Sequence, residues 1–132
     1  MTGLKARSVR SRKERRYEFA IVTAEGRFLG GCGLNQIDKA NNRANLGYWV
    51  RTTASRRGVA TRAVQSIREW GFRHTDLIRF EIVVAMGNVA SHRVAEKSGA
   101  LREGTLKRRL VLNGDAHDAT MFSFTREIKS RR

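Results

Sequence analysis

Apolar and polar positions alternate along the first third of the chain, which is typical of strands with one buried face. The alternation runs over residues 17–22, continues over 27–37 after the turn sequence 23–26, and returns over 44–50 after the polar stretch 38–43. Short polar turns between alternating segments predict hairpins. We therefore predict three consecutive antiparallel strands.

The hydrophobic period changes from two to between three and four near Gly58, which predicts an amphipathic helix over about 60–74. Its apolar stripe consists of Ala60, Ala63, Val64, Ile67 and Trp70. An apolar segment at 78–85 then predicts another strand. A helical connection of this length fits a strand-helix-strand unit with a parallel strand pair.

The second half of the chain repeats the order strand, turn and helix. We predict a helix over about 89–98, with Asn88 as its N-cap and Gly99 just past its end, where a positive φ is needed. Segments 106–112 and 119–125 flank an Asn-Gly turn and predict a closing hairpin. The predicted fold class is α+β, with a mixed, mostly antiparallel sheet of about six strands and two helices.

The turn at 55–60 is a candidate anion site, because it leads from a strand directly into a helix start. Backbone amides there point outward, Gly58 lets a ligand approach the backbone, and the helix dipole favours negative charge. A phosphate or pyrophosphate would fit such a turn. The alternative is an ordinary strand-to-helix turn with solvated arginines.

Two sequence blocks together resemble a known family. Residues 55–60 read SRRGVA and match the pattern S/Q/R-x-x-G-x-A, while residues 88–99 match N-x-x-S-x-x-x-x-E-K-x-G. Over roughly 17–127 the chain is similar to the Gcn5-related N-acetyltransferases (GNAT), specifically to the branch that acetylates ribosomal-protein N-termini. The resemblance implies acetyl-CoA as the acetyl donor and an amine acceptor, foremost the N-terminal α-amine of a protein or peptide.

The resemblance also implies which residues hold acetyl-CoA. Backbone groups of the splayed third strand would bind the thioester carbonyl and the pantetheine arm, and the amides of the turn, with two arginines, would bind the pyrophosphate. Two residues at the start of the second helix would lie beside the pantetheine and the thiol. The expected contacts are Trp49, Val50, Arg51, Arg56, Arg57, Gly58, Val59, Ala60, Thr61, Asn88 and Ser91.

Acetyl transfer needs a neutral amine and a proton for the leaving thiolate. Glu81 is the candidate base: it lies seven residues before Asn88, so strand parity would put both side chains on one face. The alternative is a surface glutamate paired with an arginine. Ser91 could relay a proton to the thiolate, or it could simply bond within a helix cap. An α-amine has a pKa near about 8, so a weak, water-relayed base would suffice.

Residues 1–16 contain seven Lys or Arg and one Glu, without apolar periodicity. We expect a flexible basic arm there, followed by a single acetyltransferase-like domain over 17–132. The arm offers no counterpart to the family's opening strand and two helices, which line the acceptor groove. We therefore expect acetyl-CoA to bind, transfer to be weak unless another chain or the missing segment completes the groove, and the chain to self-associate.

The net charge of +15 and the pI near 11.5 predict a surface that attracts anions. The rival hypothesis is a non-enzymatic basic module that binds RNA or the ribosome, although no recognised RNA motif or pair of stacking aromatics on adjacent strands supports it.

Three further features bound the class of protein. The lone Cys32 cannot form an intrachain disulfide, and we interpret it as a core residue. Because no apolar run is long enough for a membrane span, we expect a cytoplasmic protein without a membrane partner. The three histidines, His74, His92 and His117, do not fall at metal-ligand spacing, so we predict no metal.

Overall fold

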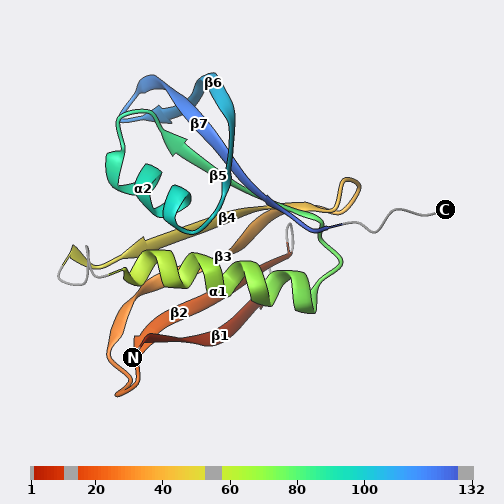
Figure 1. Cartoon of the computed structure of the whole chain (residues 1–132), viewed down its shortest axis with the longest axis vertical. Coiled ribbons are helices and arrows are strands. Elements are labelled where there is room, and N and C mark those ends of the chain that lie inside the picture. The colour runs from red at the N-terminus through yellow and green to blue at the C-terminus, as the bar shows by residue number, and fades with distance from the viewer. Residues whose placement is uncertain (1, 11–14, 53–57, 128–132) are drawn as a thin grey trace.

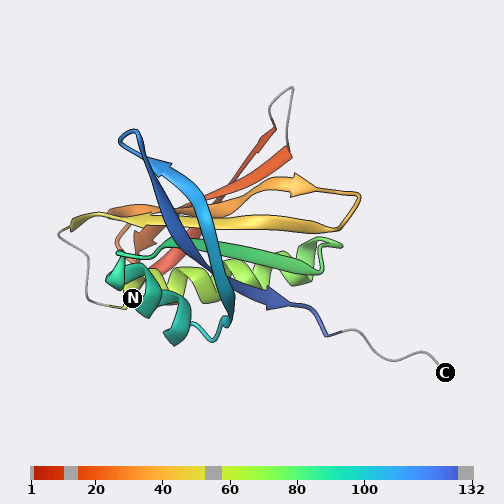
Figure 2. The ribbon, with the colours of Figure 1, turned by 90° about the horizontal axis from the view of Figure 1, so that it is seen from above.

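Seven strands form one sheet, and two helices lie against one face of it (Figures 1 and 2). The computed structural model describes residues 2–10, 15–52 and 58–127. The strands occur in the spatial order β1-β2-β3-β4-β5-β7-β6. In chain order the elements are β1 (Thr2–Arg10), β2 (Arg15–Thr23), β3 (Phe28–Asp38), β4 (Arg43–Val50), α1 (Val59–His74), β5 (Arg79–Ala85), α2 (Val89–Lys97), β6 (Leu101–Leu112) and β7 (Asp115–Thr125).

All neighbouring strands are antiparallel except β4 and β5, which are parallel. This is the mixed, mostly antiparallel sheet with two helices that the sequence predicts. The closing hairpin turns at Asn113 and Gly114, which both have the positive φ expected of an Asn-Gly turn. Gly99 likewise has a φ of 91° just past α2, as predicted.

The additional strand is β1, and it corrects the prediction of a flexible arm over 1–16. The backbone of β1 pairs antiparallel with β2 along its whole length, from Thr2 opposite Thr23 to Arg10 opposite Arg15. A strand at the edge of a sheet needs backbone partners on one side only and tolerates charged residues. Apolar periodicity therefore did not reveal it.

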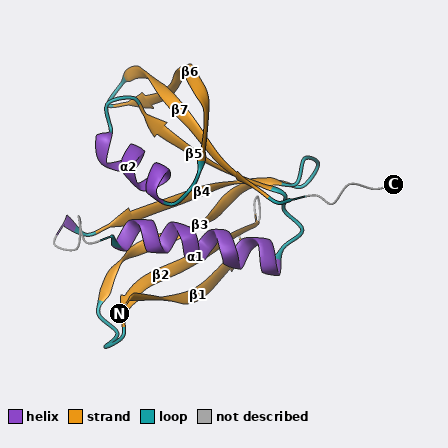
Figure 3. Cartoon of the chain, in the orientation of Figure 1, coloured by secondary structure: helices purple, strands orange, loops and turns teal. Residues whose placement is uncertain are grey.

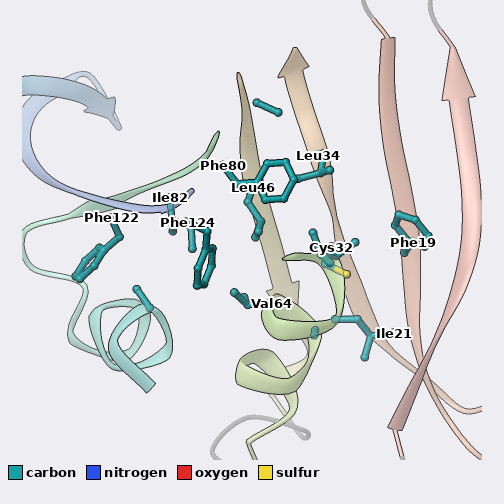
Figure 4. Packing of buried hydrophobic residues seen from close by; sticks show 14 of the residues in the cluster. Phe19, Ile21, Cys32, Leu34, Leu46, Val64, Phe80, Ile82, Phe122 and Phe124 are labelled. Atoms are coloured by element: carbon teal, nitrogen blue, oxygen red, sulfur yellow. The ribbon is translucent and has the colours of Figure 1, made fainter. Parts of the chain in front are cut away.

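The hydrophobic core lies between the sheet and the two helices (Figure 4). The apolar stripe of α1 supplies Ala63, Val64 and Ile67, all at most 1 % exposed. Cys32 is buried in this core, and burial raises the pKa of its thiol to about 12. The interpretation of Cys32 as a core residue is confirmed, because a neutral buried thiol behaves as a small apolar side chain.

The parallel pair β4–β5 opens after only three residue pairs. Arg43 lies opposite Arg79, Ala44 opposite Phe80 and Asn45 opposite Glu81, and the pairing ends there. Residues 46–50 of β4 and 82–85 of β5 then diverge, as Figures 1 and 3 show. We call this divergence the wedge. Helices α1 and α2 both begin near its open end, so their amino termini lie close to whatever the wedge holds.

Candidate functional site

The start of α1 presents backbone donors at the open end of the wedge. Gly58 occupies the N-cap position of the helix with a φ of 72°, and it has no side chain that could bond the first amides. The first intrahelical donor is Arg62, whose N–H bonds the Gly58 carbonyl at 3.1 Å. The preceding amides of residues 59–61 have no helical acceptor, and no acidic side chain lies in this first turn. The helix start therefore suits an anion.

Two predicted contacts near this turn, Arg56 and Arg57, lie outside the described residues, so their role stays a prediction. Of the remaining turn residues, Val59 is 4 % exposed and packs in the core, while Ala60 and Thr61 are partly exposed. Val59 can therefore offer a ligand its backbone and not its side chain.

The end of β4 forms the first arm of the wedge. Trp49 is 55 % exposed, and its ring packs edge-to-face on Phe28 at a centroid distance of 5.6 Å. Both rings lie on the sheet face opposite the helices, where Trp49 covers Gly31. The Arg51 N–H bonds the Leu29 carbonyl at 2.8 Å and is therefore not a free donor. The backbone groups of Trp49 and Val50 remain the candidates in this arm.

The second arm of the wedge is β5, and α2 begins just beyond its end. Asn88 is its N-cap, because Asn88 Oδ1 accepts a hydrogen bond from the Ser91 N–H at 3.1 Å. The predicted N-cap is confirmed. The cap uses the amide of Ser91 and leaves its hydroxyl free to face Tyr48 of β4, where it acts on the pKa of that phenol.

Glu81 lies at the closed end of the wedge and is paired with arginines. Its carboxylate accepts a hydrogen bond from Arg79 Nε at 2.7 Å, and Arg43 Nη1 lies 3.9 Å away. The expectation that strand parity places Glu81 and Asn88 on one face is wrong, because residues seven positions apart in a strand point to opposite faces. In addition, β5 ends at Ala85, and the chain turns before Asn88.

The structure in fact separates the two catalytic candidates. Phe80 and Ile82 point into the core, so Glu81 between them points to the opposite face of the sheet. Ser91 belongs to α2 and lies on the helix side. A substrate that reached both side chains would have to pass through the wedge.

His92 fixes the start of α2 against β7. Its Nδ1 lies 2.8 Å from the Asn88 carbonyl oxygen, which can only accept, so Nδ1 carries a proton. Its Nε2 lies 2.8 Å from Thr120 Oγ1, a residue 28 positions away. Sequence periodicity gave no signal for this long-range contact.

A shallow groove of about 420 Å³ crosses β2, β3 and β4 on the face opposite the helices. Glycines produce it: Gly31 lies opposite Trp49, and Gly33 lies opposite Gly47, so side chains are missing from the middle of this face. None of the helices in the described parts of the chain covers the groove. An acceptor approaching from this side would arrive on the same face as Glu81.

Residues 2–10, 15–52 and 58–127 contain no group of three or more His, Cys, Asp or Glu side chains that could hold a metal ion. In the same part of the chain, no helix is long and apolar enough to cross a membrane.

Comparison with known proteins agrees with this geometry. Residues 3–101 match the family described as acetyltransferase (GNAT) domain. A putative ribosomal N-acetyltransferase of Bacillus subtilis is 32 % identical over 99 residues, which cover 75 % of this chain and 54 % of that protein. A ribosomal-protein-serine acetyltransferase of Escherichia coli is 31 % identical over 98 residues, covering 74 % and 54 %.

Solved structures show the same fold. The ribosomal L7/L12 α-N-protein acetyltransferase RimL, determined in complex with coenzyme A, superposes with a TM-score of 0.76 at 28 % identity, covering 83 % of this chain and 62 % of that one. The chain thus spans little more than half the length of the two curated relatives. By the match over residues 3–101, this chain belongs to the GNAT family of acetyltransferases.

Proposed function

We propose that this chain binds acetyl-CoA in the wedge and transfers its acetyl group to an amine, foremost the N-terminal α-amine of a protein or peptide. The observation that carries the proposal is the opening of β4 from β5 after three residue pairs, beside the uncapped start of α1. An elongated ligand with an anionic end matches a gap between strands that ends at a row of amides.

The residues divide between the two ends of such a ligand. Gly58 and the amides of residues 59–61 would hold the pyrophosphate, with Arg56 and Arg57 adding charge. The backbone of Trp49 and Val50 would bind the pantetheine arm and the thioester carbonyl. Asn88 and Ser91 would lie beside the thiol, because their helix begins at the end of the second arm.

The acceptor amine would enter from the grooved face of the sheet. Glu81 faces that side, where its carboxylate is paired with Arg79, and could accept the amine proton through water. A weak base is sufficient for an α-amine, whose pKa is near about 8. The two ribosomal-protein acetyltransferases at 31 and 32 % identity support a peptide acceptor, whereas a spermidine N(1)-acetyltransferase of Escherichia coli, which acts on a small amine, matches at only 24 % identity.

The glycine at the start of α1 provides the test of the cofactor site. Gly58→Glu should abolish measurable binding of coenzyme A in calorimetry, because a carboxylate would occupy the place of the pyrophosphate and repel it. Gly58→Asn is the matched control: asparagine tolerates a φ of 72° and brings no charge. Its affinity should fall far less. Undiminished affinity in Gly58→Glu would refute the placement.

The acceptor class needs a separate measurement, since cofactor affinity does not report on it. Thiol release from acetyl-CoA should be fastest with peptides bearing a free α-amine, slower with a polyamine, and absent with N-acetylated peptides. If the chain binds RNA tightly at physiological salt and shows no affinity for coenzyme A, the rival hypothesis of a basic RNA-binding module is favoured.

A further inference from the structure

Tyr48 carries a hydroxyl that the folded chain buries and leaves unsatisfied. Its Oη is shielded from solvent, and no described residue forms a hydrogen bond with it. A buried hydroxyl without a partner costs roughly 1–3 kcal/mol. A native site that keeps such a group commonly uses it for a ligand or for chemistry.

The phenol lies in the wedge and not merely near it. Tyr48 comes three positions after Asn45, the last β4 residue paired with β5, and it lies opposite the buried Cys32 on the helix side. The Ser91 hydroxyl of α2 approaches it without the geometry of a hydrogen bond. One hydroxyl thus comes from the first arm of the wedge, and the other from the helix that follows the second arm.

We propose that the Tyr48 hydroxyl donates a hydrogen bond to the sulfur of the acetyl-CoA thioester, and so stabilises the thiolate as it leaves. This inference rests on the proposed function. The amine nitrogen forms a bond to the acetyl carbon, the carbon–sulfur bond breaks, and its electron pair remains on sulfur. The proton lost by the amine reaches the thiol through solvent, so Tyr48 ends the reaction unchanged.

The protonation of Tyr48 suits this role. Burial raises the pKa of its phenol, and the nearby Ser91 hydroxyl opposes that effect only in part. The phenol therefore remains a donor at a pH where a thiol with a pKa near about 8.5 is already ionised. A hydrogen bond to an ionised acceptor is roughly twice as strong as one between neutral groups.

The test compares binding of coenzyme A with binding of its desulfo analogue, in which hydrogen replaces the thiol. For the wild type, calorimetry should show a preference for coenzyme A that grows about tenfold between pH about 7 and about 9, as the thiol ionises. In Tyr48→Phe that growth should disappear, while affinity for the desulfo analogue stays the same. The kcat should fall about tenfold or more, with little change in the KM for acetyl-CoA.

Tyr17→Phe is the matched control, since it removes the only other phenol of the chain from a ring packed on Trp70. It should keep the pH-dependent preference. Tyr48→Phe should also unfold at the same or a higher denaturant concentration, because it removes an unsatisfied hydroxyl. A preference that persists in Tyr48→Phe refutes the role of Tyr48 alone. Failure of the wild type to bind either compound refutes the proposed function as well.

Discussion

Single glycines decide how closely this backbone can approach a ligand or another element. Gly58 takes a left-handed conformation that opens the start of α1. Gly71, inside the same helix, serves packing: a Cβ there would lie 2.5 Å from Phe80 and 2.9 Å from Leu34. The same residue type thus exposes the backbone at one end of α1 and brings it onto the sheet near the other.

Gly71→Ala should destabilise the protein although alanine is the better helix former. The added methyl group overpacks the core and should lower the free energy of unfolding by about 1–3 kcal/mol, which exceeds the gain of up to about 1 kcal/mol in helix propensity. Urea denaturation measures the difference. Gln65→Ala, at an exposed position of α1, should change stability by less than about 0.5 kcal/mol. A Gly71→Ala variant more stable than the wild type would contradict this, because it would show that Phe80 and Leu34 can move to accommodate the added methyl group.

At the scale of elements, charged side chains connect strands on the face that the helices leave open. Arg79 of β5 bonds both carboxylate oxygens of Glu103 of β6, at 2.7 and 2.8 Å, across the intervening β7. The Ser123 hydroxyl of β7 donates to the same carboxylate. Arg79 also bonds Glu81, so the proposed base belongs to a network that holds the second half of the sheet together.

Glu103→Gln should therefore weaken the protein in a pH-dependent manner. The Arg79 guanidinium, with the Ser123 hydroxyl, lowers the pKa of Glu103 from 4.5 to about 2. A carboxylate with a lowered folded-state pKa stabilises the fold above its unfolded pKa, and loses that contribution as the pH falls towards the folded value. Urea denaturation should thus show a stability difference between wild type and Glu103→Gln at neutral pH that shrinks below pH about 4.5.

The control for this experiment is Glu69→Gln, which breaks an exposed ion pair with Arg73 on α1. Exposed pairs contribute at most about 1 kcal/mol. Its effect should be small at every pH. A Glu103→Gln variant as stable as the wild type at neutral pH would mean that the carboxylate does not connect the strands.

At the scale of the whole molecule, a strong positive charge opposes association while an open sheet face favours it. The net charge is +15, and Phe28 and Trp49 are 37 % and 55 % exposed beside the groove. Burial of apolar area contributes about 25 cal/mol per Å². Repulsion between like-charged copies acts over about 10 Å at 0.1 M salt and is screened beyond that distance.

Self-association should consequently strengthen as salt is added. Light scattering should report a growing average mass between low and physiological ionic strength at high micromolar protein concentration. Binding of RNA by the same surface charge would show the reverse salt dependence. A well-folded monomer at every salt concentration would contradict the expectation of self-association.

The sequence by itself determined most local features of this protein. The change of hydrophobic period at Gly58, the cap at Asn88 and the turn at Asn113 each depend on a few consecutive residues, and each was predicted correctly. The two motif blocks also identified the family. Such signals are readable because backbone conformation and capping are set by near neighbours in the chain.

Only the tertiary structure decided which side chains meet. Strand β1 exists because β2 offers it an edge, and no apolar pattern encodes that pairing. Glu81 and Ser91 lie on opposite faces of the sheet because Phe80 and Ile82 on either side of Glu81 point into the core, while Ser91 belongs to a helix on the core side. The unsatisfied Tyr48 hydroxyl depends on β4 leaving β5 after three residue pairs. These contacts join segments tens of residues apart, so they follow from how the strands diverge and pack, which local sequence does not specify.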